Sequence, residues 1–262
     1  MPTFQSESTR NPRGKDFVPP SATSAYALRL ARNDEDVVAA QKLRYRVFNV
    51  ELGEGLESSE ASGLDRDQFD AVCDHLLVET AGGDVVGTYR LQTGSNAMER
   101  LGYYSEQEFE FAPFEEIRSE TIELGRACIA EDHRNMVVLG LLWKGIAQYA
   151  KVFGSRYLIG CSSLTSTDPQ VGNAAYQGLL RYQVEDRFQT SPIAGYECVA
   201  AEPFAENQAE PFKAPRLMRA YLTLGARLCG RPALDREFKT IDFLTLLDLQ
   251  KLGPRAMQKF LG

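Results

Sequence analysis

A strand-like segment in the middle of the chain carries two charges. Residues 121–130 have the apolar and small side chains of a buried strand, but Glu123 and Arg126 interrupt them. A charge in a buried strand is costly unless it is paired or hydrogen-bonded. A carboxylate at such a place can take a proton from an ammonium group. We expect Glu123 to act as a general base beside a reacting carbonyl, and a purely structural Glu123–Arg126 pair is the alternative.

A polar joint connects this segment to a long helix. Residues 132–135 include helix-capping types, and apolar residues at helical spacing follow as far as Phe153. Backbone N–H groups at the start of a helix can meet acceptor oxygens, and the end of a strand can hold a carbonyl. Strand, joint and helix together predict a site for an acyl donor. An ordinary strand–helix connection is the alternative.

Further charged residues stand where the pattern asks for apolar ones. Arg44 lies on a predicted helix, Asp67 and Asp70 precede a predicted strand, and Arg90 ends another. Arginine grips a carboxylate with two parallel bonds, and an acid accepts from an amine. With the two strand charges, these residues could form one linked network that binds a carboxylate and an ammonium group. From spacing alone, the preferred interpretation is a set of independent surface pairs, worth about 0–1 kcal/mol each.

Periodicity and turn signals predict the elements that position these residues. Asn33 or Asp34 can cap a first helix that ends near Phe48, and Gly82-Gly83 marks a hairpin. Strands and helices alternate, which indicates a mixed α/β sheet covered by helices. The predicted strands are 26–31, 76–80, 84–92, 121–130 and 156–161, a further helix is 170–180, and 217–228 fits either type. Residues 51–64 and 201–215 are predicted loops, and 95–120 is mixed helix and loop.

Composition restricts the class of protein. The 262 residues include 44% hydrophobic and 25% charged residues, and the net charge is −7. These values are typical of a soluble globular protein and argue against nucleic acid as a partner. Lacking eighteen consecutive apolar residues, the chain is not expected to contain a spanning helix. Five widely spaced cysteines without C-x-x-C predict neither disulfides nor zinc, and hence a cytoplasmic compartment. We expect a mobile tail over residues 1–23 and a single domain over 24–262.

Four short motifs resemble, in order and spacing, the signature of the acyl-homoserine lactone synthases. They are L-R-Y-R-V-F-N-V-E-L-G at 43–53, D-R-D-Q-F-D at 65–70, G-T-Y-R at 87–90 and E-L-G-R at 123–126. The closer resemblance is to their relatives, the ornithine lipid synthases. That resemblance also includes D-H-L-L-V at 74–78, C-S-S-L at 161–164 and the segment 230–248, G-R-P-A-L-D-R-E-F-K-T-I-D-F-L-T-L-L-D.

The resemblance implies an N-acetyltransferase-like (GNAT-like, autoinducer-synthase-like) fold, with a mixed central sheet flanked by helices and a family-specific C-terminal extension. It implies transfer of a (3-hydroxy)fatty acyl chain from acyl carrier protein to the α-amino group of ornithine, giving lyso-ornithine lipid. No metal or tightly bound cofactor is implied; acyl-phosphopantetheine is the co-substrate. The active-site residues carried over are Arg44, Phe48, Asp67, Asp70, Arg90, Glu123 and Arg126, and the donor groove follows Ile129, Arg134 and Asn135.

The acyl donor is predicted from a glycine-rich loop that the chain lacks, and the acceptor from aspartates that it has in excess. After Arg134 the chain lacks the glycine-rich loop that wraps the pyrophosphate of coenzyme A, which favours a carrier protein as donor. Asp67, Asp70 and Asp74 exceed what one or two structural arginines require, which predicts an acceptor with a second ammonium group. Basic residues suit an acidic carrier protein or a peripheral contact with an anionic inner membrane, and a solvated face is the alternative. They are Lys144, Lys151, Arg156, Arg216, Arg219, Arg227 and Arg231.

Several alternatives stay open at this point. His75 is a rival base, Tyr176 could protonate the leaving thiol, and Cys128 could carry an acyl group; each is also an ordinary structural residue. The aromatic residues between 103 and 114 line an acyl tunnel or belong to the core. The rival functions are a long-chain N-acyl amino acid synthase acting on glycine or glutamine, an acyl-homoserine lactone synthase, and a non-catalytic module that binds acyl chains or carrier protein.

Overall fold

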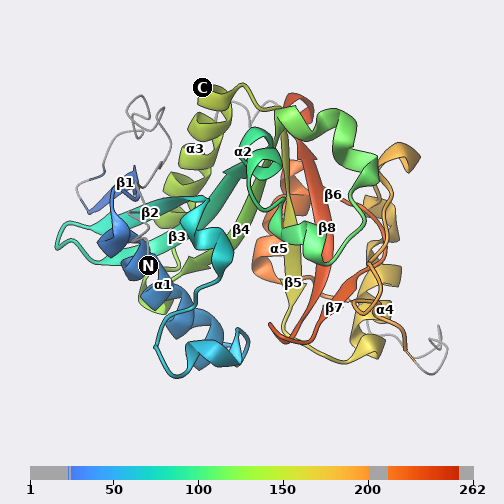
Figure 1. Cartoon of the computed structure of the whole chain (residues 1–262), viewed down its shortest axis with the longest axis horizontal. Coiled ribbons are helices and arrows are strands. Elements are labelled where there is room, and N and C mark those ends of the chain that lie inside the picture. The colour runs from blue at the N-terminus through green and yellow to red at the C-terminus, as the bar shows by residue number, and fades with distance from the viewer. Residues whose placement is uncertain (1–22, 24, 201–211, 254–262) are drawn as a thin grey trace, which may run out of the picture.

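The computed structural model describes residue 23 and residues 25–200 and 212–253. The expected tail, apart from Thr23, and most of the expected loop at 201–215 lie outside the described residues. The described part of the chain contains one mixed sheet with helices on both of its faces (Figure 1).

The sheet has eight strands, in the order β1-β2-β3-β4-β5-β8-β6, and β7 also pairs with β8. All neighbours are antiparallel except β4 and β5, which run parallel. The turn between β2 and β3 contains Gly83 at φ 89°, which confirms the hairpin predicted from the glycine pair. The strands are β1 Tyr26–Leu30, β2 Asp74–Thr80, β3 Val85–Thr93, β4 Thr121–Ile129, β5 Tyr157–Leu164, β6 Arg227–Leu228, β7 Ala233–Asp235 and β8 Thr240–Asp248.

Two helices cover opposite faces of the first half of the sheet (Figure 1): α1 (Asp34–Tyr45) and α3 (Met136–Phe153). Asn33 caps α1, as predicted, because its side chain accepts a hydrogen bond from the Asp36 N–H (2.9 Å). The chain continues from α1 into one wider π-helical turn, Arg46–Glu51, which contains the predicted helix end. The remaining α-helices are α2 Gly94–Glu99, α4 Pro169–Leu179 and α5 Arg216–Leu224.

Helix α3 carries much of the core on its buried face. Leu142, Ile146 and Tyr149 are at most 2% exposed and pack among β-strand side chains. By length and composition alone, α3 could cross a membrane, which the sequence had not led us to expect. Half of it is buried inside the molecule, as the core helix of an α/β fold requires.

Strands β4 and β5 separate partway along their length. They pair only from Thr121–Tyr157 to Glu123–Ile159. Gly160 follows immediately, and a Cβ atom there would lie 2.2 Å from the carbonyl oxygen of Leu124, so only glycine fits. On its other side, β4 shifts register against β3, and Arg126 lies within this irregularity at φ 49°. The separation leaves space between the two halves of the sheet.

Candidate active site

A pocket of about 1220 Å³ occupies the separation between β4 and β5. It is lined by both strands, by the first turns of α3, by α5 and by the turn after α1, so elements from both faces of the sheet meet there. Seven of the ten predicted site residues line it: Phe48, Arg90, Glu123, Arg126, Ile129, Arg134 and Asn135. Of the other three, Asp67 and Asp70 contact the lining arginines directly, and Arg44 is linked to them through Asp70.

Glu123 is held by the segment that follows α2 rather than by Arg126. Its carboxylate accepts hydrogen bonds from the backbone N–H groups of Tyr104 (2.7 Å) and Ser105 (2.8 Å) and from the Ser105 hydroxyl (2.5 Å). The side chain is 5% exposed. Burial raises the pKa of Glu123, although these three donors oppose the shift. A carboxylate with a raised pKa facing a pocket is suited to accept a proton. The alternative of a Glu123–Arg126 pair is wrong.

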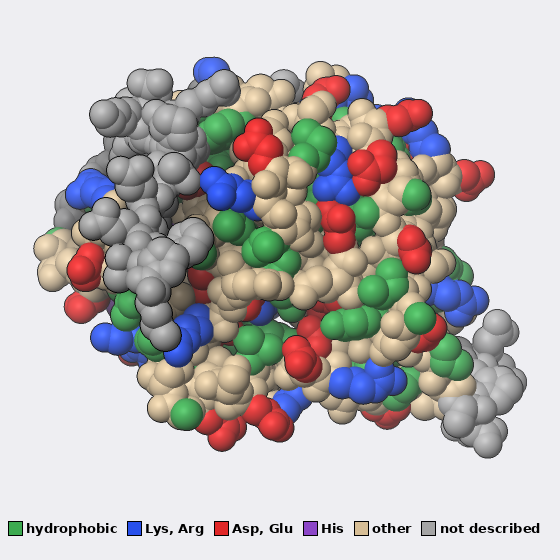
Figure 2. Space-filling model, viewed as in Figure 1, with side chains coloured by type: hydrophobic (Ala, Val, Ile, Leu, Met, Phe, Trp, Pro, Cys, Tyr) green, Lys and Arg blue, Asp and Glu red, His purple; other side chains and the backbone are tan. Residues whose placement is uncertain are grey.

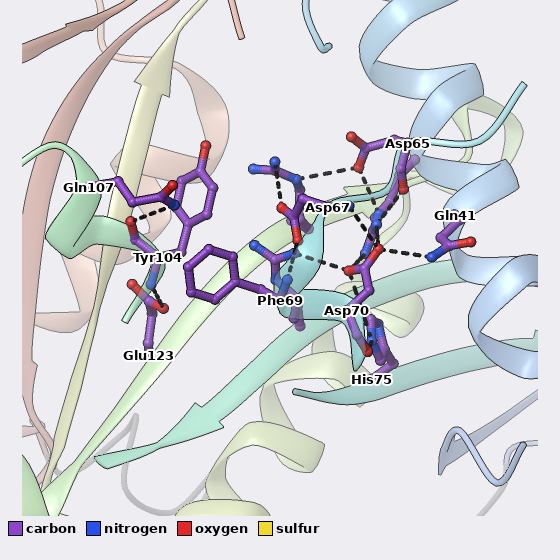
Figure 3. Close-up of polar contacts among 12 residues, drawn as sticks. Gln41, Asp65, Asp67, Phe69, Asp70, His75, Tyr104, Gln107 and Glu123 are labelled. Carbon is purple, nitrogen blue, oxygen red and sulfur yellow. Dashed lines mark hydrogen bonds and ion pairs between the residues drawn. The ribbon is translucent and has the colours of Figure 1, made fainter. Parts of the chain in front are cut away.

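Three arginines and three aspartates form one connected ion-pair network (Figure 3). Arg44 from α1 contacts Asp65 (2.8 Å) and Asp70 (2.6 Å). The guanidinium of Arg90 contacts Asp67 (2.6 Å) and Asp70 (3.0 Å), and Arg126 contacts Asp65 (3.3 Å) and Asp67 (3.0 Å). In the close-up, the three aspartates converge on the guanidinium groups, whereas Glu123 lies apart beside Tyr104. The linked network is therefore present, and the independent surface pairs that residue spacing alone favoured are wrong.

The network is buried and electrostatically balanced. Burial alone would raise the pKa values of Asp67 and Asp70, but the neighbouring arginines outweigh it and hold both below their ordinary values. Arg90 is fully enclosed, and its Nη2 atom has no hydrogen-bond partner among the described residues. Arg90 also lines the pocket, so an anionic group bound there would lie beside its guanidinium.

The aspartates therefore do not provide the surplus of negative charge that the sequence suggested. Asp67 and Asp70 are each bound by two arginines, and Asp74 accepts a hydrogen bond from the Tyr149 hydroxyl (2.7 Å). These acids brace the protein instead of facing an ammonium group. The argument for a dibasic acceptor from these three residues is wrong. It assumed that one or two arginines pair with the acids, whereas three arginines take part in the network.

Aromatic rings enclose the guanidinium group of Arg126. Its central carbon lies 4.3 Å from the ring centroid of Phe238 and 4.7 Å from that of Tyr104. Phe238 in turn packs edge-on against the predicted site residue Phe48, with ring centroids 5.4 Å apart. Phe48 therefore builds a wall of the pocket next to Arg126.

The structure confirms the predicted helix cap before α3. The cap itself, however, uses backbone N–H groups that the sequence analysis had left open to an acceptor oxygen of the substrate. The Asn135 side chain accepts from the N–H groups of Val137 (3.0 Å) and Val138 (3.1 Å), so these donors are already used. Arg134 donates from Nε to the Ile129 carbonyl oxygen (3.0 Å), and its guanidinium pairs with Glu51 beyond α1. The joint thus ties the end of β4 to the start of α3 at one edge of the pocket.

Two of the three rival residues, His75 and Tyr176, do not line the pocket. His75 is 2% exposed, its Nε2 atom is 3.1 Å from the Asp70 carbonyl oxygen, and burial lowers its pKa to about 4. Tyr176 does not line the pocket but packs against a separate core cluster around α4 and β8. Cys128 does line it, yet burial raises its pKa to about 12, so it is a poor nucleophile.

The aromatic segment belongs mainly to the core, not to an acyl tunnel. Four of its side chains are at most 6% exposed and pack together in one cluster away from the pocket: Tyr103, Phe109, Phe111 and Phe114. Only Tyr104 reaches the pocket. The core alternative therefore holds for these four residues, and the aromatic wall of the pocket is built by Tyr104 and Phe238 from separate segments.

Other residues that line the pocket or support its lining side chains escaped the sequence analysis. Asp65 is fully buried in the network, and its place in the acidic run 65–74 was a usable signal. Ser105 had no such signal, since it lies in a segment without periodicity. Glu54 and Asp242 also line the pocket as buried acids, one from a loop and one from within an apolar strand.

Comparison with known proteins shows similarity in sequence and in fold. Residues 43–144 match the family described as an acetyltransferase (GNAT) domain. The L-ornithine N(alpha)-acyltransferase of Rhizobium meliloti (strain 1021) is 33% identical over 247 residues, covering 88% of this chain and 83% of that protein. The protein of the same description from Brucella abortus (strain 2308) is 31% identical over 253 residues, covering 89% of this chain and 88% of that protein.

Among solved structures, an N-acyl amino acid synthase from uncultured soil microbes superposes with a TM-score of 0.50 at 11% identity. The match covers 86% of this chain and 91% of that one. With the family match, it establishes the predicted GNAT-like fold with its mixed sheet and flanking helices.

Proposed function

Because this chain belongs to the L-ornithine N(alpha)-acyltransferase family, we propose that it transfers a fatty acyl chain to the α-amino group of ornithine. The product is a lyso-ornithine lipid, and the acyl chain is a (3-hydroxy)fatty acyl group. The observation that carries the proposal is the relationship to these transferases, at 31–33% identity over nearly nine-tenths of the chain. The buried Glu123 facing the pocket supports it.

Glu123 is the general base of the proposed reaction. It removes one proton from the ornithine α-ammonium, and the resulting amine attacks the thioester carbonyl carbon. A carbon–nitrogen bond forms, the carbon–sulfur bond breaks, and the second nitrogen proton leaves with the thiolate as a thiol. The Ser105 and Tyr104 donors orient the Glu123 carboxylate and keep it available in its charged form.

Arg90 and Arg126 are proposed to hold the acceptor's carboxylate. Both line the pocket beside Glu123, and the unpartnered Nη2 atom of Arg90 offers a donor that the aspartates leave free. Arg44, Asp67 and Asp70 position these two guanidinium groups from behind. Phe48 supports Arg126 through the ring of Phe238.

Acyl carrier protein is the proposed donor, with its phosphopantetheine arm entering along Ile129, Arg134 and Asn135. Two observations support a carrier protein over coenzyme A. The chain has no glycine-rich loop after β4, and Asn135 already occupies N–H groups of α3 that would otherwise be open to a phosphate. The exposed Arg216 and Arg219 of α5, at the pocket, suit an acidic carrier.

A peripheral contact with an anionic membrane is also proposed, since the product carries a long acyl chain. The exposed apolar side chains of Leu52 and Met136 lie at the pocket, close in sequence to the exposed Val50 and Val137. Cosedimentation with anionic and with zwitterionic vesicles tests this contact. Equal failure to bind both vesicle types would refute it.

A competition assay tests the acceptor. The purified protein receives an acylated carrier protein with ornithine, lysine, glycine and glutamine at equal concentration, and mass spectrometry identifies the products. We expect acyl-ornithine to dominate. Preferential acylation of glycine or glutamine would contradict the proposal and favour an N-acyl amino acid synthase with a neutral acceptor.

A further inference from the structure

Two buried acids line the pocket and a third lies beside one of them, and none of the three forms an ion pair with the arginine network among the described residues. Glu54 follows the turn after α1, Glu108 follows the Ser105 segment, and Asp242 lies on β8. We call these three residues the acid cluster. Carboxylate oxygens of Glu108 and Asp242 and the Cys161 sulfur all lie within 4.8 Å of one another. Glu54, Asp242 and Cys161 line the pocket directly.

The acid cluster has hydroxyl partners but no counterion among the described residues. Asp242 Oδ2 accepts from the Thr240 hydroxyl (3.1 Å), and Glu54 accepts from the Thr165 hydroxyl. No described lysine or arginine forms an ion pair with any of the three acids. Asp242 Oδ1 and Glu108 Oε1 are buried without a hydrogen-bond partner, in side chains that are 4% and 1% exposed. Such groups are costly to leave unmatched.

The electrostatics of the cluster agree with this geometry. Burial raises the pKa of Asp242 to about 6 and that of Glu108 well above its ordinary value. The negative charge of Asp242 raises the pKa of Glu108 further, whereas the side-chain contact with Glu108 opposes the shift of Asp242. Burial also raises the pKa of Glu54. Asp235 adds a further negative charge nearby, and Arg126 offsets it only in part. A cation entering here would find three carboxyl groups and no competing salt bridge.

The position of the cluster fits one end of a diamino acid. Glu123 is paired in register with Ile159 on β5, and Cys161 lies two residues further along that strand. At about 3.3 Å per residue, the cluster beside Cys161 is about 7 Å along the sheet from the level of Glu123. The three methylenes of ornithine separate its two amino groups by a comparable length. An α-amine at Glu123 therefore places the side-chain amine toward the cluster.

We propose that Asp242 and Glu108, supported by Glu54, bind the side-chain ammonium of the acceptor and so select a diamino acid. This inference rests on the proposed function and adds the residues that choose its substrate. The ammonium supplies the donors and the positive charge that Asp242 Oδ1 and Glu108 Oε1 lack. The arginine network performs the opposite task at the other end of the same substrate, where the carboxylate binds.

Competition between ornithine and norvaline, which has the same carbon chain without the second amine, tests the subsite. Both amino acids are supplied in one tube with acylated carrier protein, and mass spectrometry measures the product ratio, which is independent of the fraction of enzyme that is folded. We expect Asp242→Asn and Glu108→Gln each to reduce the ornithine-to-norvaline ratio by about 10–100-fold. Asp248→Asn on the same strand, where Asp248 pairs with Arg156, should keep the wild-type ratio.

An unchanged product ratio in both acid-cluster variants would overturn the subsite while leaving ornithine acylation intact. A wild-type protein that prefers norvaline would instead refute the proposed acceptor itself. Chelation provides a further check, because a metal ion held by Glu108, Cys161 and Asp242 is the competing occupant. Loss of wild-type activity with a chelator, restored by a divalent cation, would reject the ammonium subsite.

Discussion

Glu123 and Asp70 are both buried acids, yet their surroundings give them opposite properties. Asp70 lies between Arg44 and Arg90, which lower its pKa and keep it charged as a structural anion. Glu123 has no ion-pair partner among the described residues and is held by three hydrogen-bond donors, so burial prevails and its pKa rises. A group with this balance can exchange a proton, whereas the aspartate cannot do so near neutral pH.

The first prediction concerns the base itself. Glu123→Gln keeps the size of the side chain and an acceptor oxygen but removes proton uptake, so the acylation rate should fall by about 10²–10⁴-fold. Single-turnover kinetics with acylated carrier protein measure the rate, and circular dichroism checks the fold. Glu120→Gln, an exposed position just before β4, is the matched control and should leave the rate unchanged. Near wild-type turnover in Glu123→Gln would remove Glu123 from the mechanism.

The second prediction concerns the pKa of that base. The Ser105 hydroxyl donates to the Glu123 carboxylate and so lowers its pKa. Ser105→Ala removes this donor, so the pKa of Glu123 should rise, and a base must be deprotonated to act. The acid limb of the kcat/KM profile should therefore move to higher pH, while the rate well above the limb changes little. Ser62→Ala, in an exposed loop, is the control; an unmoved limb in Ser105→Ala would argue against Glu123 as the titrating group.

At the scale of elements, the parting of β4 and β5 creates the site. The two strands pair with each other over three residue pairs. Beyond these, β4 remains paired only with β3, and β5 remains paired only with β8. Glu123 is the last residue of β4 that pairs with β5, and Cys161 lies two residues past this last pair on β5. The reacting groups therefore sit where backbone pairing ends and space opens between the strands. Gly160 permits the close contact that precedes this opening.

The third prediction tests this contact. In Gly160→Ala the new Cβ would lie 2.2 Å from the Leu124 carbonyl oxygen, so the strands must shift and the free energy of unfolding should fall by about 1–3 kcal/mol. Gly140→Ala in α3 is the matched substitution, since a Cβ there meets no atom within 4 Å. It should raise stability, by up to about 1 kcal/mol, through helix propensity. Urea denaturation measures both; equal effects of the two changes would contradict this account.

At the scale of the whole molecule, the net charge of −7 opposes an acidic partner, so docking must be local. Figure 2 shows acidic and basic side chains intermixed over the visible face, with no broad basic surface there. Arg216 and Arg219 instead place two exposed positive charges on α5 at the pocket. Docking of a carrier protein should therefore depend on a few charges near the entrance.

The fourth prediction follows from this arrangement. Arg219→Glu should raise KM for acylated carrier protein with little change in kcat, because it reverses one exposed charge at the docking site. In the wild type, kcat/KM should fall as salt rises, since screening acts over about 8 Å at physiological ionic strength. Lys42→Glu, exposed on α1, is the control of equal charge change. Equal efficiency with acyl-coenzyme A, or no effect of salt, would count against a carrier protein.

Local patterns in the sequence determined most of the elements. The apolar patterns of β1 to β4, the glycine pair of the hairpin, the Asn33 cap and the helical spacing of α3 all depend on residues close together in the chain. The ordered motifs also located the residues that line or support the pocket. They did so through resemblance, since spacing alone could not distinguish one network from several surface pairs.

Only the tertiary structure decided which charges meet. Arg126 contacts Asp67 across 59 positions, and Glu123 contacts Ser105 in a segment with no periodicity. Asp242 reads in the sequence as an odd charge within an apolar strand, yet the fold brings it to Glu108 and Cys161. Sequence periodicity reports which face of an element is buried, not what packs against that face. The partners of a buried charge, and hence its pKa and its role, depend on strand order and on where β4 and β5 part.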